Sequence, residues 1–95
     1  MARRSKKARV ASLHDERYQR FVELLVQRRR ASAKSQQIVA DELGWNQSIM
    51  AKIETAQRRI DIIELIRVAD VVGFDVVKLV QDLRRQMIAE GDISG

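Results

Sequence analysis

Beyond residue 11, apolar side chains recur every three or four positions along most of the chain, a spacing that predicts amphipathic helices. The first predicted helix begins at Ser12, whose hydroxyl can cap backbone amides while Asp15 completes a capping-box arrangement. This helix is expected to continue to about Ala31. Its expected buried face carries Tyr18, Phe21, Leu24 and Leu25.

Two shorter helices are predicted next, and only a tight turn separates them. Ser35 is the N-cap candidate of a helix that ends at Gly44, a residue suited to the left-handed conformation of a helix end. Asn46 can cap the following helix, 47–55, at once, and Trp45 in the turn is expected to pack between helices. This arrangement predicts a helix-turn-helix. The side chains expected to face the core are Val39, Ala40, Leu43, Met50 and Ile53.

The last two predicted helices both start at an aspartate. Asp61 and Glu64 form a second capping box, and the helix that they begin ends at Gly73. Asp75 caps the fifth helix, which runs to Gly91. The recurring apolar positions of these two helices are Ile62, Leu65, Ile66, Ala69, Val72, Val76, Leu79, Val80, Leu83 and Met87. With no repeat and no strand hairpin signal, the sequence predicts an all-α fold of five helices.

The composition excludes several classes of protein. A chain of 95 residues forms one domain with a thin core. It has no Cys, and its single His14 lacks partners for a metal cluster, so we expect no disulfide, metal or cofactor. An enzyme is not expected, because there is no Gly-rich phosphate loop and carboxylates such as Asp61 and Asp75 occupy capping positions. No apolar run reaches the roughly 20 residues of a membrane span, which favours a cytoplasmic protein without a membrane partner.

The positive charge of the chain is concentrated at its start. Residues 1–10 carry five basic and no acidic side chains, whereas the remaining 13 basic residues are matched by 13 acidic ones. We expect residues 1–11 to form a flexible basic arm whose partner is a polyanion, because each cation placed on a phosphate releases a condensed counterion. A merely solubilising segment is the alternative.

Three segments together resemble a known family. They read SQQIVADELG at 35–44, NQSIMAKIE at 46–54 and RRIDIIEL at 58–65. The set is similar to the phage-repressor (Cro/C1, or XRE) type of helix-turn-helix domain, and the resemblance covers about residues 18–80. It implies a lambda-repressor-like DNA-binding domain whose third helix enters the major groove of double-stranded DNA.

The resemblance also implies roles for single residues. The side chains that would face bases are Gln47, Ser48, Ala51 and Lys52. Those that would hold the DNA backbone are Gln36, Arg58, Arg59, Lys34, Arg3 and Arg4. The residue types suit these roles, because a Gln amide offers adenine a donor and an acceptor together, Lys donates to guanine, and Arg forks onto phosphate.

Three positions depart from the family pattern. Ala33 and Ala56 stand where Gly is common, and Lys34 stands where an aliphatic residue is usual. A left-handed Ala56 would cost on the order of 1 kcal/mol, so we expect a slightly different turn there. Two alternatives are expected for Lys34. Either its aliphatic stem covers the edge of the core and its amine points towards DNA, or the turn before the second helix is rearranged.

A domain of this size can hardly bury both of its last two helices completely, so part of the fifth is expected to face a second subunit. The expected dimer interface is Val76, Leu79, Val80, Leu83 and Met87. The sequence thus divides into an arm at 1–11, a DNA-binding and dimerisation domain at 12–90 and a tail at 91–95.

We interpret the chain as a homodimeric transcriptional regulator of bacterial or phage origin that binds a near-palindromic operator. A repressor or self-regulating controller is favoured over an activator, and antitoxins that repress their own promoters have a similar layout. Two alternatives stay open. One is a protein-interaction module whose main partner is a toxin or another regulator, and the other is unspecific nucleic-acid binding through the arm.

Overall fold

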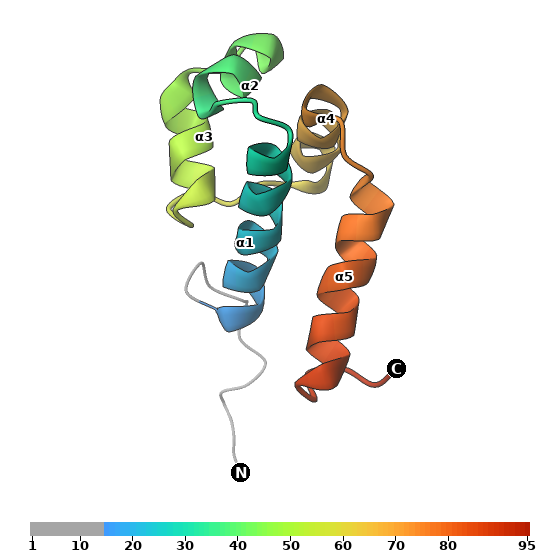
Figure 1. Cartoon of the computed structure of the whole chain (residues 1–95). Helices are drawn as coiled ribbons and strands as arrows, with labels where there is room; N and C mark the ends of the chain where they lie inside the picture. Colours follow the sequence, from blue (N-terminus) through green and yellow to red (C-terminus); the bar gives the residue numbers. More distant parts are fainter. Residues whose placement is uncertain (1–14) are drawn as a thin grey trace.

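The computed structural model of the chain describes residues 15–95, and this part forms five α-helices and no strand (Figure 1). The helices are α1 (Glu16–Ala31), α2 (Gln36–Leu43), α3 (Gln47–Glu54), α4 (Ile62–Val72) and α5 (Val76–Ala89). The predicted all-α architecture is therefore confirmed. The expectations for the basic arm and for His14 lie outside the described residues.

Most of the predicted helix ends are found at the expected residues. The side chain of Ser35 accepts from the backbone amide of Ile38, and Asp75 accepts from two amides at the start of α5. Asp61 and Glu64 form the reciprocal capping box. Because each side chain satisfies amides that have no partner inside the helix, the caps fix where α2, α4 and α5 begin.

Two of the predicted capping arrangements differ from those found. The first helix begins at Glu16 rather than after Ser12, because the carboxylate of Asp15 accepts from the amide of Arg17 and so takes the N-cap position itself. Asn46 occupies the N-cap position of α3, but its side chain makes no capping hydrogen bond.

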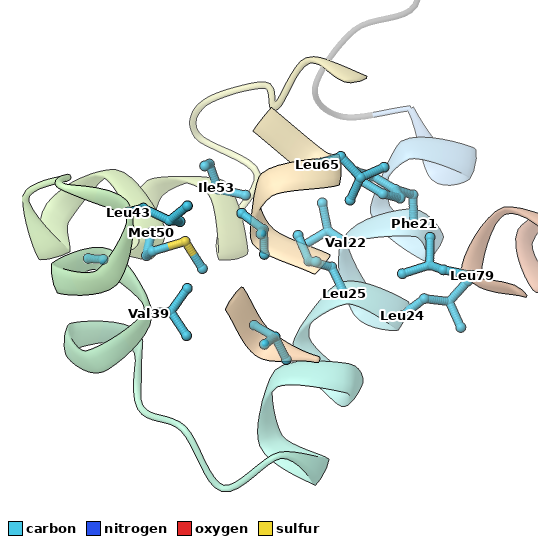
Figure 2. Packing of buried hydrophobic residues seen from close by; sticks show 13 residues of the cluster. Phe21, Val22, Leu24, Leu25, Val39, Leu43, Met50, Ile53, Leu65 and Leu79 are labelled. Atoms are coloured by element: carbon cyan, nitrogen blue, oxygen red, sulfur yellow. The ribbon is translucent and has the colours of Figure 1, made fainter. Parts of the chain in front are cut away.

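The core is formed by side chains from all five helices, as Figure 2 shows for its principal members. Leu25, Val39, Met50, Ile53, Val68 and Leu79 are completely or almost completely buried. The helical period predicted most of these positions. Among the apolar positions of α4, Ile62 and Ile66 are 59% and 48% exposed, in line with the expectation that the last two helices are not both completely buried. These two side chains lie at the edge of the apolar face of α4, where no other helix of residues 15–95 covers them.

The two longest helices form one side of the molecule, and they run in opposite directions (Figure 1). Two ion pairs join them, one from Arg28 to Asp82 in the middle of α5 and one from Arg20 to Glu90 at the end of α5. The short helices α2 and α3 pack against each other at one end of this pair. None of the helices in 15–95 is long and apolar enough to cross a membrane.

Candidate nucleic-acid interface

The turn between α2 and α3 sets the angle at which α3 leaves the body of the protein. Gly44 has a φ of 76°, which the turn requires and which glycine adopts without strain. The amide of Trp45 donates to the carbonyl of Ala40 over 2.8 Å. The indole packs against the core and has the Arg67 guanidinium 6.0 Å from its ring, so the predicted packing role of Trp45 is confirmed.

One face of α3 is buried and the opposite face is open. Met50 and Ile53 point into the core with no exposed surface. Gln47, Ser48 and Lys52 are exposed and Ala51 is half-buried, so the four residues predicted to face bases lie together on the outer side of one helix. Neither Ser48 nor Lys52 has a side-chain hydrogen bond or ion pair with any residue in 15–95, so both keep their full capacity to bind a ligand.

The side chain of Gln47 is held by a residue of α2. Its Nε2 donates to Oε1 of Gln36 over 2.8 Å. The Nε2 of Gln36 in turn donates to Oε1 of Glu54 over 2.9 Å. The first residue of α2 thus bridges the first and the last residue of α3, and it lies beside the exposed face of α3.

Sequence reasoning missed a buried ion pair behind this bridge. Both oxygens of Glu54 accept from the guanidinium of Arg29, at 2.6 and 2.8 Å, and the Glu54 side chain is only 4% exposed. Arg29 also donates to the carbonyl of Lys34 over 3.0 Å, and the hydrogen bond to Glu54 raises the pKa of its guanidinium. The sequence did contain one signal for this ion pair. Glu54 is an acidic residue seven positions after Gln47, on the flank of α3 that faces α1.

The loop after α3 carries the two arginines predicted to hold the DNA backbone. The guanidinium of Arg58 is paired with Glu64, at 2.9 and 3.2 Å. The guanidinium of Arg59 lies 4.9 Å from the centre of the Tyr18 ring, and the Tyr18 hydroxyl accepts from the amide of Ile60. These contacts attach the loop to the start of α1 and leave the Arg58 side chain 38% exposed at the surface.

Lys34 is bound within the protein. Its ammonium donates to the carbonyl of Val71 over 2.6 Å and to Glu42 over 3.2 Å, so its stem crosses from the start of α2 to the end of α4. The amine therefore points at a carbonyl and a carboxylate of the same chain, which differs from the expectation of an amine directed at DNA.

Both alanines at the glycine positions are left-handed. Ala33 has a φ of 63° and Ala56 a φ of 59°. The expected different turn at Ala56 is therefore wrong: the chain keeps the turn and accepts the unfavourable contact of the Cβ atom instead.

The predicted dimer interface divides into buried and exposed parts. Leu79 has no exposed surface, because it packs within the core of its own chain, and it cannot contact a partner. Val76, Leu83 and Met87 are half-buried, while Val80 is 46% exposed. Leu83 and Met87 line a groove of about 480 Å³ together with Asp15, Arg17, Tyr18, Phe21 and Arg59.

Comparison with known proteins finds similarity to a solved structure. No protein-family model and no curated protein sequence matches the chain. Among solved structures, the chain is similar to an XRE-family like protein from Pseudomonas syringae pv. tomato str. DC3000, with 35% identity and a TM-score of 0.73. The match covers 78% of this chain and 90% of that one. At this identity and coverage, and with the same helix-turn-helix arrangement, the chain belongs to the XRE family of DNA-binding transcription regulators.

Proposed function

We propose that the protein is a sequence-selective regulator that binds a near-palindromic operator as a homodimer, with α3 in the major groove, and acts as a repressor or self-regulating controller. The observation that carries the proposal is the outer face of α3, where Gln47, Ser48 and Lys52 are exposed together on a helix whose other face is fixed in the core. A rigid helix with an exposed polar face is what base reading in the major groove needs.

The chemistry of this face favours particular bases. One N–H of Gln47 is used by Gln36, which leaves its Oε1 and the second N–H for the N6 and N7 atoms of adenine. The free ammonium of Lys52 suits the O6 and N7 acceptors of guanine. Ala51 offers a methyl group, which can contact the methyl of thymine.

Contacts with the DNA backbone are proposed for Gln36, Arg58 and Arg59, beside the two ends of α3. The 13 basic residues of 15–95 equal the 13 acidic ones in number. Long-range attraction therefore depends on the arm, where Arg3 and Arg4 are proposed backbone contacts. Lys34 is omitted from this set, because its ammonium is directed at the end of α4, where it donates to the carbonyl of Val71 as well as to Glu42.

The homodimer is supported by apolar side chains that no other helix in the described part of the chain covers. On α5, Val77 and Val80 are 61% and 46% exposed. Met87, seven positions after Val80 on the same helix, is half-buried. A second copy related by a two-fold axis would cover them and would set two recognition helices about 34 Å apart, the repeat of the DNA groove.

Fluorescence anisotropy tests the proposal. The protein is titrated onto DNA from upstream of its own gene and onto a scrambled duplex, across a salt series. We expect a preference of about a thousandfold, reduced by roughly 1 to 3 kcal/mol in Gln47→Ala. Gln81→Ala, an exposed glutamine on α5, is the matched control and should bind as the wild type does. Equal, steeply salt-dependent binding to both duplexes would contradict sequence reading at this site.

A further inference from the structure

We propose that Glu54 is a positioning residue for base selectivity: through Gln36, the buried Arg29–Glu54 pair sets which end of the Gln47 amide faces the DNA. This inference rests on the proposed function, because it concerns how the same surface distinguishes bases. It assigns a role in recognition to two residues that lie behind the surface and touch no base.

The first step is the nature of Glu54. A carboxylate accepts hydrogen bonds and cannot donate them. Arg29 holds it in place, with its Nε on Oε2 and one Nη on Oε1, in a site where the Glu54 side chain is 4% exposed. Any neighbour that bonds to Oε1 must therefore present a donor.

The second step is the orientation of Gln36. Because Oε1 of Glu54 takes a donor, the NH₂ group of Gln36 is turned towards it, at 2.9 Å. The oxygen of Gln36 then faces away from Glu54, towards Gln47 at the start of α3. A flipped Gln36 would place its own oxygen against the carboxylate, so the buried charge excludes that orientation.

The third step is the orientation of Gln47. The oxygen of Gln36 accepts from Nε2 of Gln47 over 2.8 Å, so the NH₂ group of Gln47 lies on the α2 side. The Gln47 oxygen is left on the other side, where it remains available to a ligand. The order of donor and acceptor along the outer face of α3 is thus decided at Glu54, two hydrogen bonds away.

This fixed order predicts which base pairs are accepted. Adenine presents a donor and an acceptor in the major groove, whereas guanine presents two acceptors. A Gln47 oxygen held in one place pairs with the adenine N6 amino group and opposes the guanine O6. An amide free to flip would offer either end and would tolerate both purines better.

The test uses the full-length protein and four operators that differ only at the base pair read by Gln47, recognised as the pair whose preference disappears in Gln47→Ala. The variants are Gln36→Met, which breaks the chain of hydrogen bonds and leaves the ion pair intact, and Glu54→Gln, which removes the charge. Gln37→Met is the matched control, because the neighbouring Gln37 bonds to Asp41 and has no part in the chain of bonds.

We expect Gln36→Met to reduce the adenine-over-guanine preference at that pair by about tenfold or more, within the range that one bidentate base contact supplies. Preferences at other pairs should be unchanged. Loss of a phosphate contact alone would weaken all four operators equally, and that result would overturn the inference. Glu54→Gln should show the same selective loss, and thermal unfolding by circular dichroism verifies that each variant is folded.

The side-chain amide signals of Gln47 in the NMR spectrum of the free protein give a second readout. They should shift in Gln36→Met and stay in place in Gln37→Met, and unchanged signals in both would overturn the inference. A wild type that binds the four operators equally overturns the proposed function and this inference with it. Wild-type selectivity that Gln36→Met leaves intact overturns this inference alone.

Discussion

Two alanines occupy backbone conformations that glycine adopts more easily, and each is a local site of strain. Ala33 and Ala56 have φ angles of 63° and 59°, at the turns before α2 and after α3. A left-handed alanine costs roughly 1 kcal/mol, because its Cβ approaches the following carbonyl oxygen. The turns persist because the helices on either side of them are held by the core and by caps such as Ser35.

We therefore expect Ala33→Gly and Ala56→Gly each to raise the free energy of unfolding, by about 0.5 to 1 kcal/mol after the greater entropy of glycine in the unfolded chain is deducted. Urea denaturation measures the change. Ala89→Gly is the control, because Ala89 lies within the last turn of α5, where glycine should lower stability. A loss of stability at both left-handed positions would contradict this account of the turns.

Glu64 links the loop after α3 to stability at low pH. Its hydrogen bonds from Arg58 and from the backbone of Asp61 hold the pKa of its carboxyl below the ordinary value of 4.5. Because the folded pKa is depressed, the contribution to stability is present above about pH 4.5 and is lost as the pH falls through the folded pKa. Asp82, whose pKa is lowered by its hydrogen bond with Arg28, acts in the same direction.

Glu64→Gln should lower stability at pH 7 and reduce the difference in stability between pH 7 and pH 3. Glutamine can still complete the capping box, so the variant isolates the charge. The unfolding free energy measured across this pH range, with Glu16→Gln as an exposed control, checks the expectation. A Glu64→Gln profile parallel to that of the wild type would rule out this carboxylate as a source of the acid sensitivity.

Single residues were predictable from the sequence where their partners are close in the chain. Asp61, Glu64 and Gly44 were assigned correctly, because caps and turns depend on neighbours within four positions. Glu54 and Arg29 are 25 positions apart, and their pairing depends on how α1 and α3 pack. Local spacing carries no information on that packing, so the part of the site that fixes Gln47 was missed.

At the scale of the element, α5 has a buried apolar side next to an exposed one. Leu79 is fully buried against α1, and the next residue, Val80, is 46% exposed. The helical period predicted an apolar stripe correctly, but it could not show which member of the stripe belongs to the core. That division depends on how far α5 rotates when it packs against α1, and the sequence pattern alone leaves the rotation open.

Substitutions at these two positions should separate folding from association. Leu79→Ala should lower the unfolding free energy by about 2 to 5 kcal/mol, the usual range for a cavity of this size. Val80→Glu should shift the dimer to monomer with a smaller loss of monomer stability, because a charge is placed on the proposed interface.

Analytical ultracentrifugation at several concentrations measures the association, and urea denaturation measures the stability. Gln81→Glu adds the same charge one position further along the exposed side of α5 and serves as the control. If Val80→Glu and the wild type have the same mass at every concentration, Val80 lies outside the contact between subunits.

At the scale of the whole molecule, charge and shape are divided between different parts of the chain. Residues 15–95 have equal numbers of acidic and basic side chains, and the five additional cations are all in residues 1–10. We expect the folded part to supply selectivity and the arm to supply much of the attraction to the phosphates.

Deletion of residues 1–10 should therefore weaken binding to operator and scrambled DNA by similar factors and preserve their ratio. Each lost phosphate contact should reduce the slope of log K against log salt by about 0.9, to a maximum of about 4.5 for five cations. Anisotropy titrations at three salt concentrations measure both quantities. A ratio that collapses to one on deletion would mean that the arm, rather than α3, distinguishes the operator.

The burial of Leu79 against α1 also determines the order of events during synthesis. Phe21 and Leu79 are separated by about 60 residues, which a ribosome adds in roughly 3 to 12 s. Throughout that interval the apolar face of the first helix lacks the last helix that covers it, and exposed apolar surface of this kind is prone to aggregation. A chain that ends before Leu79 cannot complete this core, so we expect truncated copies to be much less stable than the full chain.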